Sequence, residues 1–169
     1  MTVLVAPDPD WPRQAERAIA DWTAKIPGLL AVHHVGSTAV QGLPAKPVID
    51  LLPVFASEAA ASQSRPAVEA MGYEWLGNYG LPGRYYCRQS DPDTGLRIVQ
   101  AHGYVMGDAR IAGYLAFRDA LRQNGPLRAA YTAEKARCAA RHPEGGAAYG
   151  QCKSGWIARA ETVALARAE

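Results

Sequence analysis

The sequence predicts an α+β domain in which helices cover a β-sheet, and three observations lead to this class. The chain has 169 residues, of which 49% are hydrophobic and 20% charged, as is typical of one globular core. Candidate strands gather within 29–105, and alanine- and arginine-rich helical segments follow from 109 onward. Because strands and helices do not alternate regularly, a parallel βαβ sheet is disfavoured. We expect one domain over 1–169, with a helix-and-sheet core in 1–107 and a helical cap in 108–169.

The first expected elements are a helix and two strands. Pro12 is typical of a helix start, and apolar residues recur at helical spacing until a Pro-Gly pair at 27–28 ends the pattern. Residues 29–35 and 48–52 are rich in aliphatic side chains and are predicted to be strands, the second ended by Pro53. The polar segment between them contains glycines and prolines and is predicted to be a loop.

The next expected element is a helix that Ser57 caps and that continues to about Met71. Three strands separated by glycine- and proline-bearing turns follow, and the last two should form a hairpin. These strands are expected at 73–76, 84–89 and 96–105. Three helices complete the chain, at 109–123, 126–141 and 146–168.

Charge and hydropathy narrow the classes of function. Residues 1–108 carry 8 Lys and Arg against 11 Asp and Glu, whereas residues 109–169 carry 10 against 5. The basic C-terminal part can attract an anion, but it lacks the dense basic patches typical of nucleic-acid-binding proteins. The sequence shows neither an apolar run long enough for a membrane helix nor a signal peptide, so we expect a cytoplasmic protein without a membrane partner. Its oligomeric state is left open.

The three cysteines are Cys87, Cys138 and Cys152. They form no C-x-x-C pair, which argues against a disulfide framework and against a structural zinc site. We therefore expect reduced thiols.

The most informative segment is the turn that follows the strand 29–35. Gly36 lets the backbone approach a phosphate, and the hydroxyls of Ser37 and Thr38 can donate to its oxygens. Asp50 lies inside the next aliphatic strand, where an ionised carboxylate is costly unless a cation, a metal or several donors hold it. We expect Asp50 to face a pocket that it shares with this turn. Lys46 is close enough in sequence to approach either Asp50 or a phosphate. A hydroxyl-capped turn and a structural aspartate are the alternative interpretations.

Other candidate residues come from the later strands and helices. Strand periodicity places Arg84 and Arg88 on one face, where two guanidinium groups could hold a phosphate or a carboxylate. Lys153, near aromatic residues at helical spacings, is a further candidate for the pocket. His34 and His102 could join Asp50 in a metal site or in acid–base chemistry if their strands are adjacent, although a structural histidine is the more common role.

Three parts of the N-terminal half form one pattern: the run 34–40 (His-Val-Gly-Ser-Thr-Ala-Val), the run 42–47 (Gly-Leu-Pro-Ala-Lys-Pro) and Asp50. This pattern resembles the GrpB family, which is placed in the nucleotidyltransferase superfamily with a polymerase-β-like fold. The resemblance continues in the helical blocks, at 117–122, Tyr131, Lys135, Tyr149 and 152–157. It covers about Trp11 to Ile157 and implies a mixed sheet followed by helices.

The resemblance also implies a site. In that superfamily a Gly-Ser turn seats the triphosphate, and strand carboxylates hold two divalent metals. By that analogy Gly36 and Ser37 would bind phosphate, and Asp50 would bind a divalent metal, expected to be Mg²⁺. The sequence departs from the pattern at Leu52, where a second carboxylate is usual, and neither 84–89 nor 96–105 supplies a third. A His-x-His pair common in the family is Gln100-Ala101-His102 in this sequence, which leaves one imidazole, His102.

Three hypotheses of function follow. The first is a GrpB-like enzyme that acts on a nucleotide or another phosphorylated small molecule, with Asp50 and His102 in catalysis, and with Arg88 and Lys153 completing the pocket. The second is a non-catalytic module that binds a phosphorylated ligand, which the loss of carboxylates favours. The third, a metal-dependent hydrolase or transferase, depends on His34 as a ligand beside Asp50 and His102.

Overall fold

The structure, a computed structural model, describes residues 4–168 and is built on one five-stranded sheet. The strands are β1 (Leu29–Val35), β2 (Ile49–Phe55), β3 (Glu74–Trp75), β4 (Tyr85–Ser90) and β5 (Arg97–Val105). Their order across the sheet is β1-β2-β5-β4-β3; β2 and β5 run parallel, and the other neighbours run antiparallel. The expected mixed sheet and the hairpin of its last two strands are confirmed.

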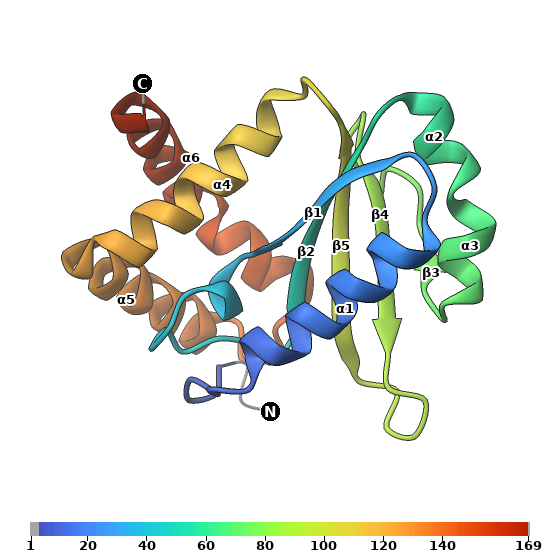
Figure 1. The fold of residues 1–169 in the computed structure, drawn as a ribbon. Coiled ribbons are helices and arrows are strands. Elements are labelled where there is room, and N and C mark those ends of the chain that lie inside the picture. Colours follow the sequence, from blue (N-terminus) through green and yellow to red (C-terminus); the bar gives the residue numbers. More distant parts are fainter. Residues whose placement is uncertain (1–3, 169) are drawn as a thin grey trace.

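Six α-helices and one short 3-10 turn are found in the described residues. They are α1 (Trp11–Lys25), η1 (Ser37–Ala39), α2 (Glu58–Gln63), α3 (Arg65–Ala70), α4 (Ala109–Gln123), α5 (Gly125–Arg141) and α6 (Gly146–Ala168). In Figure 1, α1 crosses one face of the sheet, and the three C-terminal helices gather beside β1 as the expected cap. None of the helices within 4–168 is long and apolar enough to cross a membrane.

Two expectations about β2 and the following helix were wrong for reasons that involve proline. Pro53 does not end β2, because β2 pairs with β5 at 49–51 and again at 54–55, and the missing N–H of Pro53 falls between these stretches. The helix that Ser57 caps is divided into α2 and α3. Pro66 cannot donate to a carbonyl in the preceding turn, so the ladder of helical hydrogen bonds is interrupted.

The expected reduced state of all three cysteines was also wrong. Cys138 and Cys152 form a disulfide that joins α5 to α6, whereas Cys87 is free and buried in β4. The two partners are 14 residues apart on separate helices, so no short cysteine motif marks them in the sequence.

The main core lies between the sheet and α1. Trp22 of α1 is 1% exposed and contacts Tyr73 edge to face, with ring centroids 5.4 Å apart. The same cluster contains Leu51 of β2 and Ala101 of β5. The opposite face of the sheet packs on α4 through Leu52 and other apolar side chains. Asp50 belongs to that second face, so the site opens toward the C-terminal helices.

We expect Trp22→Ala to lower the free energy of unfolding by about 3–5 kcal/mol, because it removes a large buried side chain and leaves a cavity. Urea unfolding followed by circular dichroism measures this loss. Leu96→Ala, at a side chain that is 59% exposed, is the control and should change stability by less than about 0.5 kcal/mol. A loss at Trp22 no larger than that at Leu96 would contradict this description of the core.

Candidate functional site

The turn after β1 approaches the carboxylate of β2 very closely. Gly36 has φ +71° and ψ −168°, a backbone conformation that is essentially restricted to glycine. A Cβ atom added at Gly36 would lie 2.5 Å from Oδ2 of Asp50, so the absent side chain is what allows this approach. Asp50 therefore faces the turn, as the sequence predicted.

Asp50 is held by side chains of the neighbouring strand β5. The residue directly opposite it in the parallel register is Gln100, whose Nε2 donates to Asp50 Oδ1 at 2.5 Å. His102 Nε2 lies 3.4 Å from the same oxygen. These contacts answer how a carboxylate is accommodated in an aliphatic strand.

Gln100 in turn is fixed by two further donors. Its Oε1 accepts from Tyr86 Oη at 3.0 Å and from Arg97 Nη1 at 3.2 Å. Because its oxygen is engaged in this way, Gln100 presents amide N–H to Asp50. The carboxylate thus lies at the end of a chain of hydrogen bonds that begins at Tyr86 and Arg97.

Lys135 of α5 joins the cap to the turn. Its side chain is 1% exposed, and Nζ donates to Ser37 Oγ at 3.1 Å and also to the carbonyl oxygen of Pro44. Burial, together with the charge of Lys153, lowers the pKa of Lys135 to about 7. Because Lys135 contacts the Ser37 hydroxyl and can gain a proton near neutral pH, it can provide positive charge to an anion bound at the turn.

Lys153 of α6 is a second lysine of the helical cap near Asp50. Its Nζ is 4.4 Å from the ring centroid of Tyr149. Burial lowers the pKa of Lys153, and the nearby charge of Asp50 opposes that effect, while Lys46 adds to it. These couplings place Lys153 within electrostatic range of Asp50, Lys46 and Lys135.

The chain has only four lysines beside fourteen arginines. Lys135 contacts the turn, and Lys46 and Lys153 are near enough to Asp50 for its charge to affect their pKa values. The fourth, Lys25, pairs with Asp21 on the exposed face of α1. In the part of the chain described, Lys46, Lys135, Lys153 and Arg97 form no ion pair within 4 Å. The surroundings of the turn and of Asp50 therefore contain four basic side chains and one carboxylate.

His34 does not join Asp50 in the expected cluster. Its Nε2 lies 2.9 Å from Thr38 Oγ1, so His34 and Thr38 fix the turn from inside. Burial lowers the pKa of His34 to about 4, which leaves the imidazole neutral at neutral pH. Thr38 is 4% exposed, and its hydroxyl is engaged by His34 instead of facing the lysines.

The two strand arginines have separate positions. Arg84 donates to the carbonyl oxygens of Asn78 and Tyr79 and covers the ring of Tyr86, so it organises the loop before β4. Arg88 pairs with Glu74 at 2.6 Å. It also lines a cavity of about 510 Å³ with Lys46 and Arg97, which the connection 143–146 closes from the helical side.

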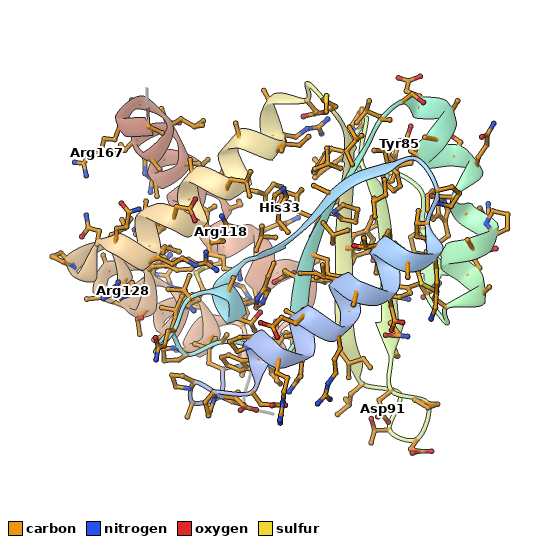
Figure 2. The ribbon with its side chains drawn as sticks, viewed as in Figure 1. His33, Tyr85, Asp91, Arg118, Arg128 and Arg167 are labelled. Carbon is orange, nitrogen blue, oxygen red and sulfur yellow. A yellow bond between two sulfur atoms is a disulfide. The ribbon has the colours of Figure 1, made fainter. Side chains whose placement is uncertain are left out.

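Two arginines of α4 support the turn through its backbone. Arg118 Nη1 donates to the carbonyl oxygen of His34, and Arg122 Nε donates to that of Ala39. Figure 2 shows Arg118 on α4 reaching toward β1, where His33 is labelled. These arginines position the turn and do not enter the group of lysines.

The donor set around Asp50 does not fit a two-metal centre. The position opposite Asp50 is the amide Gln100, and Leu52, two residues farther along β2, is fully buried among apolar side chains. Within 4–168 there is no group of three His, Cys, Asp or Glu side chains that could hold a metal ion. The cationic groups around Asp50 further disfavour a divalent cation there. The expected binding of Mg²⁺ stays a prediction.

Sequence reasoning missed three residues of this site. It did not select Lys135 as a site residue, and it noted Gln100 only as the replacement of a family histidine. Arg97 was not considered. The scarcity of lysine in an arginine-rich chain was an available signal for Lys135, whereas the roles of Gln100 and Arg97 depend on strand register.

Comparison with known proteins relates the chain to a family. A family model described as GrpB protein matches residues 2–162. The chain is 36% identical over 135 residues to the UPF0157 protein YqkA of Bacillus subtilis, a match that covers 80% of this chain and 38% of YqkA. The chain thus spans well under half the length of that relative.

Solved structures support the same relation and show the fold. The crystal structure of the conserved protein GrpB from Enterococcus faecalis superposes with a TM-score of 0.87 at 31% identity, covering 98% of both chains. The Cid1 poly(U) polymerase superposes with a TM-score of 0.57 at 12% identity, covering 88% of this chain and 49% of that one. The chain therefore has a nucleotidyltransferase-like fold.

Gly36→Ala should lower stability more than Gly42→Ala, by about 1–3 kcal/mol, because only the first substitution places a methyl group against Asp50. Both glycines have positive φ, +71° and +77°, but a Cβ at Gly42 meets nothing within 4 Å. Gly42→Ala thus serves as the control for the cost of placing an alanine at positive φ. Equal losses in urea unfolding would show that contact with Asp50 does not constrain the turn.

Proposed function

The chain belongs to the GrpB family, and we propose that it binds a nucleotide or another phosphorylated small molecule between the turn 36–38 and the lysines of α5 and α6. The observation that carries this proposal is the contact of Lys135 with Ser37 of the turn beside Asp50, and the charge of Asp50 also acts on Lys46 and Lys153. Lys135 is buried and Lys153 is partly buried, whereas Lys46 is exposed. Cations without a counter-ion in buried positions are costly, and an anionic ligand offsets that cost.

The geometry supports a specific way of holding the phosphate. Ser37 Oγ accepts from the buried Lys135 Nζ at 3.1 Å, so its hydroxyl proton is free to be donated to a phosphate oxygen, and the ammonium group lies directly behind that contact. Lys153 approaches from α6 and balances the negative charge of Asp50 next to the ligand. Lys46 and Arg97 line the adjoining cavity of about 510 Å³, which offers room for the rest of the ligand.

The arrangement favours binding that needs no divalent cation. Fixed ammonium groups supply the positive charge that metals supply in two-metal sites. Transfer of a phosphorylated group is the second candidate function. It is favoured by Asp50, which faces the turn, accepts from Gln100 and has His102 at 3.4 Å, so the carboxylate can accept a proton from an attacking hydroxyl.

Calorimetric titration with inorganic triphosphate, ATP and UTP, each in EDTA and in Mg²⁺, tests the proposal. We expect binding in both conditions and an affinity about tenfold or more lower for Lys153→Gln, because a partly buried charged contact is lost. Lys25→Gln, on the exposed face of α1, should bind as the unaltered protein does.

Each outcome of that titration has a clear meaning. No heat with any ligand in either condition would contradict the proposed function. Binding in Mg²⁺ that disappears in EDTA would restore the metal-dependent hypothesis, and Asp50→Asn should then abolish it. If Asp50→Asn leaves binding intact but stops turnover of a nucleotide, transfer is supported.

Binding should also take up a proton at pH 8. In the protein without ligand, Lys135 has a pKa of about 7 and is mostly neutral at pH 8. A bound anion favours the charged ammonium form and therefore raises that pKa. Sulfate is a suitable probe because its charge is constant between pH 5 and 9, and affinity should fall as the pH rises through 7. Titration in two buffers with different ionisation enthalpies measures the uptake.

At about pH 5.5 Lys135 is already protonated, so the uptake should vanish there. Lys135→Gln should remove the uptake at pH 8, and Lys25→Gln should leave it in place. Uptake at pH 8 that persists in Lys135→Gln would assign the titrating group to another residue.

A further inference from the structure

The disulfide between Cys138 and Cys152 links the two helices that carry site lysines. Lys135 lies three residues before Cys138 on α5, and Lys153 directly follows Cys152 on α6. The residues enclosed by the bond include 143–146, which form one wall of the cavity beside Lys46 and Arg97. The bond therefore constrains both the spacing of the two helices that carry Lys135 and Lys153 and the cavity wall beside Lys46 and Arg97.

The two sulfur atoms have different surroundings. Cys138 is fully buried, whereas Cys152 is partly exposed on α6. Arg137 Nη2 lies 3.5 Å from Cys138 Sγ and 3.6 Å from Cys152 Sγ, and Glu134 Oε1 lies 3.8 Å from Cys138 Sγ. A small thiol can reach Cys152 from solvent, whereas Cys138 is enclosed. Arg137 is paired with Glu134 and lies equally close to both sulfur atoms, so exposure, and not charge, distinguishes the two cysteines.

We propose that this disulfide is a redox switch of the phosphate site, opened by attack of a low-molecular-weight thiol on Cys152 Sγ. The regulatory part of this inference rests on the proposed function, since the switch acts on Lys135 and Lys153. Cys152 is then the position that carries the mixed disulfide, and Cys138 is the thiolate that leaves.

The exchange balances in two steps. The attacking thiolate forms a new S–S bond to Cys152, the bond between Cys152 and Cys138 breaks, and its electron pair stays on Cys138 Sγ. A second thiol attacks the mixed disulfide, so that Cys152 leaves as a thiolate. Overall two small thiols become one small disulfide, and the protein gains two electrons and two protons. A small-molecule disulfide closes the bond by the reverse steps.

Other contacts keep the two helices together when the bond is open. The rings of Tyr131 on α5 and Trp156 on α6 stack with centroids 5.1 Å apart. Freedom is therefore gained beyond this stacked pair, around the cysteines and in the connection between the helices, where Gly145 and Gly146 both have positive φ. Lys153 is expected to lose its fixed distance from Lys135, and the cavity wall to move with it.

Titration of the oxidised and the reduced protein with inorganic triphosphate tests the regulatory part. We expect the oxidised form to bind about fivefold or more tightly, which corresponds to the weakening of one charged contact. The double variant Cys138→Ser/Cys152→Ser should behave as the reduced form in either buffer. Cys87→Ala, which removes the third cysteine, should retain the difference. Equal affinities, with the bond state verified by mass spectrometry, would overturn the switch.

A second measurement tests the chemistry without any phosphate ligand. Exposed to a small-molecule disulfide, Cys138→Ser should form a mixed disulfide at Cys152 about tenfold faster than Cys152→Ser forms one at Cys138, because only Cys152 is accessible. Circular dichroism confirms that both variants are folded. Comparable rates would overturn the assignment of Cys152. If triphosphate binds to neither redox form, the proposed function fails, and this rate comparison still decides the role of Cys152.

Discussion

The close approach of the Gly36 backbone to the Asp50 carboxylate is the constraint on which the site depends. It allows the turn after β1 to lie directly beside β2, which brings Ser37 to the position where Lys135 contacts it. The backbone of the turn is held from α4 by Arg118 and Arg122. The helical cap therefore contacts the sheet through this turn, beside the Asp50 carboxylate.

Much of the fold could be predicted from local patterns. The ranges expected for α4 and α6 agree with the structure, because their boundaries are set by an aspartate cap, an Asn-Gly-Pro break and a glycine pair. Ser57 caps its helix as expected, by accepting from the amide of Ala60. The two errors at Pro53 and Pro66 have a common origin. The effect of a missing N–H depends on whether a neighbour needs it, and strand register is not visible in the sequence.

The site divides in the same way. Gly36, Ser37 and Asp50 are local in sequence, and their proximity followed from two strands with a short connection. Lys135, Gln100 and the pairing of Cys138 with Cys152 depend on how distant elements meet. Periodicity placed His34 on one face of its strand but could not tell that Thr38 would engage it. The resemblance to the GrpB family identified the region and left these contacts open.

The use of lysine in this chain has a physical explanation. Arginine provides almost all other positive charge, yet it keeps its proton under nearly any condition and holds a broad planar group. Lysine can lose its charge when buried, as the lowered pKa of Lys135 illustrates, so the folded protein does not have to retain every charge at this site. Under the proposed function, a site of lysines stays folded without a ligand and becomes fully charged when an anion binds. In that proposal Asp50, which accepts from Gln100, provides the negative charge that favours the ammonium form of Lys153.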